Sequence, residues 1–174
     1  MSTVVLQLKK LGIDDIVHFD YMDPPAPETL MRALEQLNYL GALDDDGNLT
    51  KIGEQMSEFP LDPMLSKMII TSSERYYCTK EILSIVSLIS VPNIFIRPRD
   101  QQAESDSAKM KFTCQDSDHI TMLNAFNAFL MKNRDADWCW TNYLNYRALK
   151  QTSDIRNQLE NMATRQGLEI RSTS

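Results

Sequence analysis

Apolar side chains recur every three or four positions between residues 28 and 40, a spacing typical of one face of an amphipathic helix. The run before it, Asp23-Pro-Pro-Ala-Pro27, cannot lie inside a helix, because each proline fixes its own φ and pushes the preceding residue out of the α region. The pattern therefore predicts an extended arm that leads into a helix beginning at Pro27 or Glu28.

The next segment combines a turn with a short helix. Asp46-Gly47-Asn48 lies between Leu43 and Leu49, which predicts a small β-hairpin. Thr50 is a favourable N-cap for a helix over residues 51–58. Helix, hairpin and short helix in this order form the outline of a winged helix. Some winged helices bind nucleic acid and others only pack against neighbours, so the outline alone leaves the function open.

Beyond residue 60 most of the hydrophobic spacing is helical, with no alternating β pattern, although the polar residues 100–117 show no strong apolar face. Five helices are expected: Asp62-Pro63 to Tyr76, Lys80 to Ser90, Asp118 to Lys132, Trp138 to Lys150, and a last helix that ends at Gly167. The expected N-caps are Thr79 for the second helix, Asp116 or Ser117 for the third, and Ser153 or Asp154 for the last. Pro92 to Asp100 is expected to be irregular. Amphipathic helices, each with one apolar face, that are joined by short loops predict a helical bundle.

The balance of charge narrows the possible functions. The formal net charge is −6 and the isoelectric point about 4.9, which argues against a free-standing, charge-driven nucleic-acid binder but leaves local basic contacts open. No apolar run is long enough to cross a bilayer, so we expect no membrane partner. The N-terminus lacks the basic and apolar segments of a signal peptide.

We expect no metal site and no disulfide. Cys78, Cys114 and Cys139 are odd in number and lack C-x-x-C spacing, so we interpret them as reduced thiols in the cytosol or nucleus. The acidic run before Gly47 resembles a calcium loop only superficially, since the corresponding EF-hand register would begin at Ala42 instead of an aspartate. A wing turn explains the same residues.

No catalytic residue is predicted. The only histidines are His18 and His119. A nucleophilic triad needs a serine or cysteine beside a histidine that an acid orients. Asp118-His119 lies at an expected helix start with no such nucleophile beside it, so capping and packing explain the pair.

Six side chains are candidates for binding RNA. Arg97 and Arg99 flank Pro98, and a rigid loop that carries arginines can present guanidinium groups to phosphate. The alternative for both is a surface salt bridge with the many nearby acids. Arg156 either faces the same ligand or pairs with Glu160 four residues on.

The other three candidates are Asn142, Asn145 and Arg147, in the run Asn142-Tyr-Leu-Asn-Tyr-Arg147. Their side chains can bond to phosphate, to a 2′-hydroxyl or to base edges. A hydrogen-bond network that ties the helical bundle to the winged helix or to a neighbouring domain is an equally good interpretation of Asn145 and Arg147. The neighbouring Trp140, Tyr143 and Leu144 are expected to pack inside the bundle.

Several of these motifs, in this order, resemble the C-terminal region of DEAH-box RNA helicases. The resemblance covers Phe19–Leu34, Leu37–Thr50, Phe59–Leu65, Val91–Pro98, Asp118-His119, and Asn142–Arg147 with Asp154–Arg156. It is strongest to the pre-mRNA-splicing helicase type that acts in spliceosome disassembly and ribosome biogenesis. The resemblance implies a mainly α fold: residues 1–26 end a RecA-like domain and its linker, residues 27–60 form the winged helix, and residues 61–170 form the ratchet (HA2) bundle. The RecA-like and OB-fold domains are absent from the sequence.

The resemblance also implies a function. The parent would be an ATP-dependent RNA helicase, and this part of it would line the single-stranded RNA channel and support translocation. The sequence has no G-x-x-x-x-G-K-[ST] loop and no Asp-Glu-Ala-His segment. We therefore expect ATP and Mg²⁺ to bind the parent's other domains, with no cofactor and no ATP hydrolysis in this fragment.

The partners implied are single-stranded RNA, the helicase's own RecA-like and OB-fold domains, G-patch proteins and spliceosome components, in the nucleus and also in the nucleolus or cytoplasm. A second hypothesis is a protein-interaction platform for G-patch activators without independent RNA binding, which the acidic charge favours. A third, a winged helix like that of a transcription factor, would need a basic recognition helix. Residues 28–39 instead set Arg32 against Glu28 and Glu35.

Overall fold

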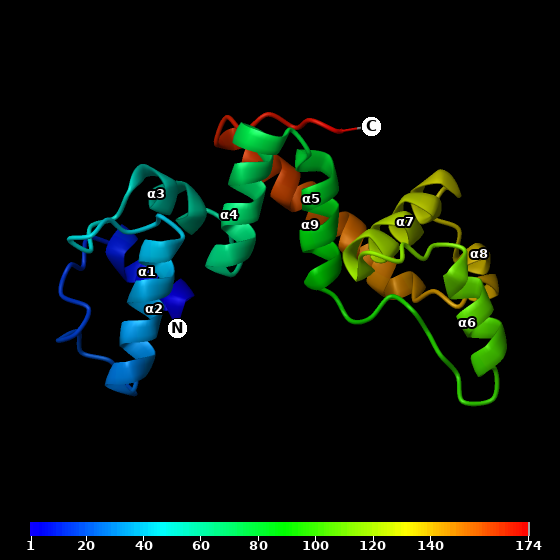
Figure 1. Ribbon diagram of the computed structural model, residues 1–174, viewed down its shortest axis with the longest axis horizontal. Helices are drawn as coiled ribbons and strands as arrows, with labels where there is room; N and C mark the ends of the chain where they lie inside the picture. Colours follow the sequence, from blue (N-terminus) through cyan, green and yellow to red (C-terminus); the bar gives the residue numbers. More distant parts are fainter. Residues whose placement is uncertain (174) are drawn as a thin grey trace. The chain divides into compact units, whose positions relative to one another are not determined.

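The computed structural model describes residues 1–173 and divides into two compact units. The first comprises Met1–Tyr77 and Met162–Glu169, and the second comprises Cys78–Asn161 and the residues from Ile170 onward. The longest helix, α9 (Tyr146–Arg165), begins in the second unit and ends in the first (Figure 1). No helix within residues 1–173 is both long and apolar enough to cross a membrane.

The first unit is helical and contains α1 (Ser2–Lys10), α2 (Pro27–Tyr39), α3 (Lys51–Ser57), α4 (Pro63–Thr71) and η1 (Ser72–Tyr76), a turn of π-helix that continues α4 (Figure 1). Helix α1 packs against α2 and α3, and α3 packs against α4. Val5, Leu6 and Leu37 are buried in this unit. That residues 1–26 end a RecA-like domain stays a prediction.

Local capping sets the helix starts that the sequence predicted in this unit. Helix α2 begins at Pro27, after the extended arm. The Thr50 hydroxyl accepts a hydrogen bond from the Gly53 N–H (3.0 Å), and the Asp62 carboxylate accepts one from the Met64 N–H (3.0 Å). These three predictions are confirmed. Each depends on groups no more than three residues apart, which explains why sequence alone was sufficient.

The expected β-hairpin is not confirmed. Leu43 and Leu49 form one antiparallel bridge, and residues 1–173 contain no sheet. The Asp44 N–H donates to the Asn48 carbonyl (2.9 Å), while the Asp44 carboxylate accepts from the Asn48 N–H (2.8 Å). These bonds hold the pKa of Asp44 below its ordinary value. Hydrogen bonds to the Asp44 side chain within the turn thus take the place of a longer series of backbone hydrogen bonds between two strands.

The second unit contains α5 (Thr79–Ile89), α6 (Gln102–Met110), α7 (Asp118–Met131), α8 (Ala136–Thr141) and most of α9. Helix α5 packs against α7. The core of the unit is an apolar cluster drawn from α5, α7, α8, α9 and the loops between them: Leu88, Ile94, Phe112, Ala125, Phe126, Phe129, Cys139, Leu144, Ala148 and Leu149.

Three predicted boundaries in this unit are wrong. Thr79 is the buried first residue of α5 instead of its N-cap, which is Cys78. The expected helix from Trp138 to Lys150 is two helices, α8 and α9, separated by a turn at residues 142–145. Helix α9 then runs through Ser153 and Asp154 without a break, because core packing continues on both sides, where Leu149 and Leu159 are buried. The buried Thr152 hydroxyl donates to the Ala148 carbonyl (2.8 Å) inside the helix.

Candidate functional site

Two segments of the second unit, far apart in sequence, pair with each other. The Ile96 N–H donates to the Tyr143 carbonyl (2.8 Å), and the Asn145 N–H donates to the Ile94 carbonyl (2.7 Å). Between them Phe95 and Leu144 form an antiparallel bridge. We call residues 94–101 together with residues 140–147 the bridge surface. It brings five of the six candidate residues onto neighbouring segments, while Arg156 lies further along α9.

The turn at residues 142–145 has an unusual backbone. Tyr143 adopts a left-handed conformation (φ 54°), which is uncommon for a residue other than glycine. Tertiary contacts hold it there: the Leu144 side chain is buried in the core, the Leu144 N–H donates to the Cys139 carbonyl (2.9 Å), and the Tyr143 hydroxyl donates to the Gln101 side chain (2.9 Å). The strain is maintained by the pairing of the two segments.

Asn142 and Asn145 both bond to the protein itself. Asn142 is only 7% exposed; its amide donates to the Trp138 carbonyl (2.9 Å) and accepts from the Lys111 ammonium (3.2 Å). The Asn145 side-chain oxygen accepts from the Ala148 N–H (3.1 Å) and so caps α9. Both asparagines therefore shape the turn. The Asn145 NH₂ group makes no hydrogen bond within residues 1–173 and stays open to a ligand.

The arginines differ in how far they are engaged. Arg97 forms a bidentate ion pair with Asp106 of α6, with both N–O distances at 2.8 Å. The pair raises the pKa of Arg97 and lowers that of Asp106. Arg99 and Arg147 are exposed, and within the described residues they form no ion pair. These two are the cations of the bridge surface that need no rearrangement to reach a phosphate.

Arg156 lies in a different environment. It is half-buried, its Nε donates to the Ser84 hydroxyl (3.0 Å), and its Nη1 forms an ion pair with Glu160 (2.8 Å). The alternative expected for it, an i,i+4 pair on the last helix, is therefore present. It lines a small pocket of about 290 Å³ between α5, α7 and α9. The structure does not bring Arg156 to the bridge surface.

An aromatic groove opens on the bridge surface. Its volume is about 390 Å³, and it is lined by Ile96, Pro98, Gln101, Trp140, Thr141 and Tyr143. A second groove of about 450 Å³ adjoins it through Thr141 and Tyr143 and extends along α6 to Glu104 and Lys111. Both grooves lie between α6, α8 and the loop before α6, and they share Thr141 and Tyr143 in their lining.

Trp140 corrects one expectation. It was predicted to pack inside the bundle, yet its side chain is 73% exposed. Trp138, two residues earlier, packs edge-on against Phe112 with ring centroids 6.1 Å apart. Side chains two apart on a helix point about 200° away from each other, so only one of the two can face the core. The i,i+2 spacing of the tryptophans was the signal that could have identified an exposed ring.

Charge on the bridge surface differs from the chain as a whole. Residues 94–111 and 135–147, which contain both grooves, carry five basic and five acidic side chains. The excess negative charge of the chain therefore lies elsewhere in the sequence. A phosphate approaching this region meets no net charge of the same sign.

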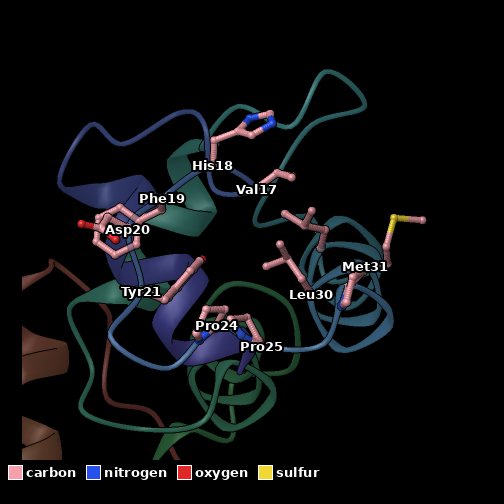
Figure 2. Close-up of a pocket in the computed structure, with 11 residues that line it drawn as sticks. Val17, His18, Phe19, Asp20, Tyr21, Pro24, Pro25, Leu30 and Met31 are labelled. Carbon is pink, nitrogen blue, oxygen red and sulfur yellow. The ribbon is translucent and has the colours of Figure 1, made fainter.

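A separate pocket lies in the first unit, between the extended arm and α2 (Figure 2). It has a volume of about 610 Å³, and apolar side chains dominate its lining: Val17, Phe19, Tyr21, Pro24, Pro25, Pro27, Leu30, Met31 and Leu34, with His18 and Asp20. The Tyr21 hydroxyl donates to the Ile16 carbonyl (3.1 Å), and His18 pairs with Asp15 (2.8 Å). Hydrogen bonds from His18 lower the pKa of Asp15.

The remaining candidate groups show no catalytic arrangement. His119 is exposed on the first turn of α7, where the Ser117 hydroxyl provides the cap by accepting from the Ile120 N–H (3.3 Å). The three cysteines are free thiols, and burial raises the pKa of Cys139 to about 11. A thiol of this kind is not a nucleophile at neutral pH.

Two parts of the chain match known protein families. Residues 33–61 match the winged-helix part of the helicase associated domain (HA2), and residues 62–122 match its ratchet-like part. The first match covers α2 from Ala33 to α3, and the second runs from α4 into α7. Residues 94–101 of the bridge surface lie within the ratchet-like match, and residues 140–147 lie beyond it.

Proposed function

Because this chain carries the winged-helix and ratchet-like HA2 domains, which are accessory modules of DEAH/RHA-type helicases, we propose that it lines a single-stranded RNA path in such an enzyme. The bridge surface would form one wall of that path. The ATP and Mg²⁺ that drive the parent helicase would bind outside this chain, which we expect to be inactive as an ATPase. Pre-mRNA splicing, spliceosome disassembly, ribosome biogenesis and a nuclear location remain part of the proposal through the resemblance described above.

One observation supports the proposal most. The pairing of residues 94–96 with residues 143–145 joins the segments that carry Arg97, Arg99 and Arg147, and side chains from these segments line an aromatic groove. Residues 94–111 and 135–147 together carry no net charge. Such a combination suits contacts to an RNA backbone with bases nearby, because phosphate contacts supply affinity and aromatic rings accept any base. The contacts would be largely independent of sequence.

The test is a titration of a labelled oligo-U strand with this chain, followed by fluorescence anisotropy at low and at physiological salt. We expect the affinity to fall as the salt concentration rises. For Arg99→Ala and Arg147→Ala, the plot of log affinity against log salt concentration should be less steep, by about 0.7 per lost phosphate contact. Arg165→Ala removes the same charge from the last turn of α9, which belongs to the first unit, and serves as the matched control. Equal losses from all three variants would point to non-specific charge effects and contradict the proposed surface.

The apolar pocket in the first unit favours a second function for the same chain, that of a docking platform. A protein segment with apolar anchors, such as an amphipathic segment of a G-patch protein, would place them between the arm and α2. Met31 lines this pocket and is 60% exposed, whereas Met64 is 54% exposed on α4 and lies outside the pocket.

Met31→Gln and Met64→Gln form a matched pair for testing this function. We expect the first substitution to weaken binding of a G-patch peptide, measured by calorimetry, and the second to leave it unchanged. RNA binding should be the same in both. If the two substitutions affect the peptide equally, the pocket is not its site.

A further inference from the structure

We propose that the aromatic groove of the bridge surface holds one unpaired RNA base, stacked on the exposed ring of Trp140 between Pro98 and Tyr143. The inference deepens the proposed function and rests on it, because it names how the strand would be held. It goes beyond backbone contacts: the bound strand must present a base with a free face, so duplex RNA would be excluded at this position.

The Trp140 ring is unusually exposed. Large aromatic rings usually bury most of their surface, and a ring 73% exposed beside a concave surface leaves an apolar face without a partner. Its helical neighbour Cys139 is fully buried in the core, which fixes the side of α8 that faces the core and leaves Trp140 on the outer side. The groove offers a stacking face whose location is set by the fold.

The other walls of the groove are also fixed. Pro98 is a rigid ring, and Tyr143 is held by its hydroxyl bond to Gln101 and by the backbone bond between its carbonyl and Ile96. Little side-chain freedom would be lost when a flat ligand enters, so binding would cost little conformational entropy. The polar groups of the lining are few, and two of them, the Tyr143 hydroxyl and the Gln101 side chain, already bond to each other, so they offer little to read a base edge in detail.

The charges on the groove segments favour one kind of occupant. Aromatic grooves also bind proline-rich peptides, so a peptide is the competing occupant. Arg99 and Arg147, however, flank the groove segments without acidic partners within residues 1–173, and Arg97 lies next to Pro98. Cations beside a stacking ring complement a strand in which each base is joined to a phosphate. They give no advantage to an uncharged proline-rich segment.

The experiment uses the complete chain with Trp138→Phe, a variant that leaves Trp140 as its single tryptophan. Its fluorescence is recorded during titration with oligo-U, with an abasic strand of equal length, and with a polyproline peptide. In parallel, anisotropy measures oligo-U binding by Trp140→Ala and Trp140→Phe. Circular dichroism checks that each variant is folded.

We expect oligo-U to quench Trp140 and the abasic strand to bind more weakly without quenching. Trp140→Ala should reduce oligo-U affinity on the order of 10-fold with an unchanged salt slope, and Trp140→Phe should retain most of the affinity, because stacking is lost in one and kept in the other. This pattern differs from that of the arginine variants, which change the slope.

Two results would overturn the inference alone: salt-sensitive oligo-U binding without quenching and without an effect of Trp140→Ala, or quenching by the polyproline peptide but not by RNA. In the first case the proposed RNA path still stands. If oligo-U fails to bind the unsubstituted chain at either salt concentration, the proposed function and the inference both fail. The outcomes are therefore distinguishable.

Discussion

Gly53 provides a sharp test of how the winged-helix part is packed. It lies in the first turn of α3, close to the residues that form the wing. A Cβ atom at this position would lie 2.2 Å from the Ala42 carbonyl oxygen and 2.7 Å from a methyl carbon of Leu49. The same carbonyl accepts hydrogen bonds from the N–H (3.0 Å) and the hydroxyl (3.2 Å) of Thr50. Gly53→Ala therefore pushes α3 away from the chain segment that anchors its own N-cap.

Two effects of opposite sign compete in this substitution. Alanine is favoured over glycine inside a helix by about 1 kcal/mol. Overpacking typically costs about 1–3 kcal/mol, and the upper end applies here, because the atom in the way belongs to the backbone and not to a flexible side chain. We expect the steric effect to win, with a net loss of about 2 kcal/mol in the free energy of unfolding.

The assay is urea unfolding followed by far-UV circular dichroism. For slopes of about 1–3 kcal/mol/M, the expected loss lowers the urea midpoint by about 1 M. Lys51→Ala is the matched control, since Lys51 is exposed in the same turn and its replacement should change stability by less than about 0.5 kcal/mol. Stability of Gly53→Ala equal to or above that of the unsubstituted chain would refute the close approach of α3 to Ala42.

Three further predictions concern the second unit. Asn145→Ala should lower the stability of α9 by about 1 kcal/mol, while Asn145→Asp keeps the cap and should stay within a few tenths; urea unfolding monitored by tryptophan fluorescence measures both, and an unaffected alanine variant would contradict the capping role. Asp106→Asn releases Arg97 and should tighten oligo-U binding in anisotropy, whereas unchanged affinity would show that Arg97 does not face RNA. The pKa of Cys139 is about 11 in the folded chain against 9.0 ordinarily. As the pH rises, the unfolded chain therefore loses the thiol proton before the folded chain does. The contribution of the protonated Cys139 thiol to the free energy of unfolding is complete below pH 9 and is lost as the pH rises through 11. Between pH 8 and pH 10.5, the free energy of unfolding should fall by about 2 kcal/mol more for the unsubstituted chain than for Cys139→Ala. An equal fall in both chains would exclude the effect.

The sequence by itself determined those features whose causes lie within a few residues. These features follow from groups at most four positions apart in the chain. They are the helix start at Pro27, the caps at Thr50, Asp62 and Ser117, and the ion pair of Arg156 with Glu160. A side chain and a backbone group this close in the chain meet in nearly any fold that contains the helix. The candidate arginines and asparagines were found for a similar reason, from local residue type.

Only the tertiary structure decided what those candidates do. The break between α8 and α9 depends on pairing with residues 94–96, more than forty positions earlier, which stabilises the left-handed Tyr143. The same pairing places Asn145 as a cap, while the exposed ring of Trp140 follows from which side of α8 faces the core. Local propensity allows a continuous helix there, because residues 138–150 contain no proline or glycine. The burial of Leu144 in a core contributed by distant helices selected the turn instead, and with it the groove.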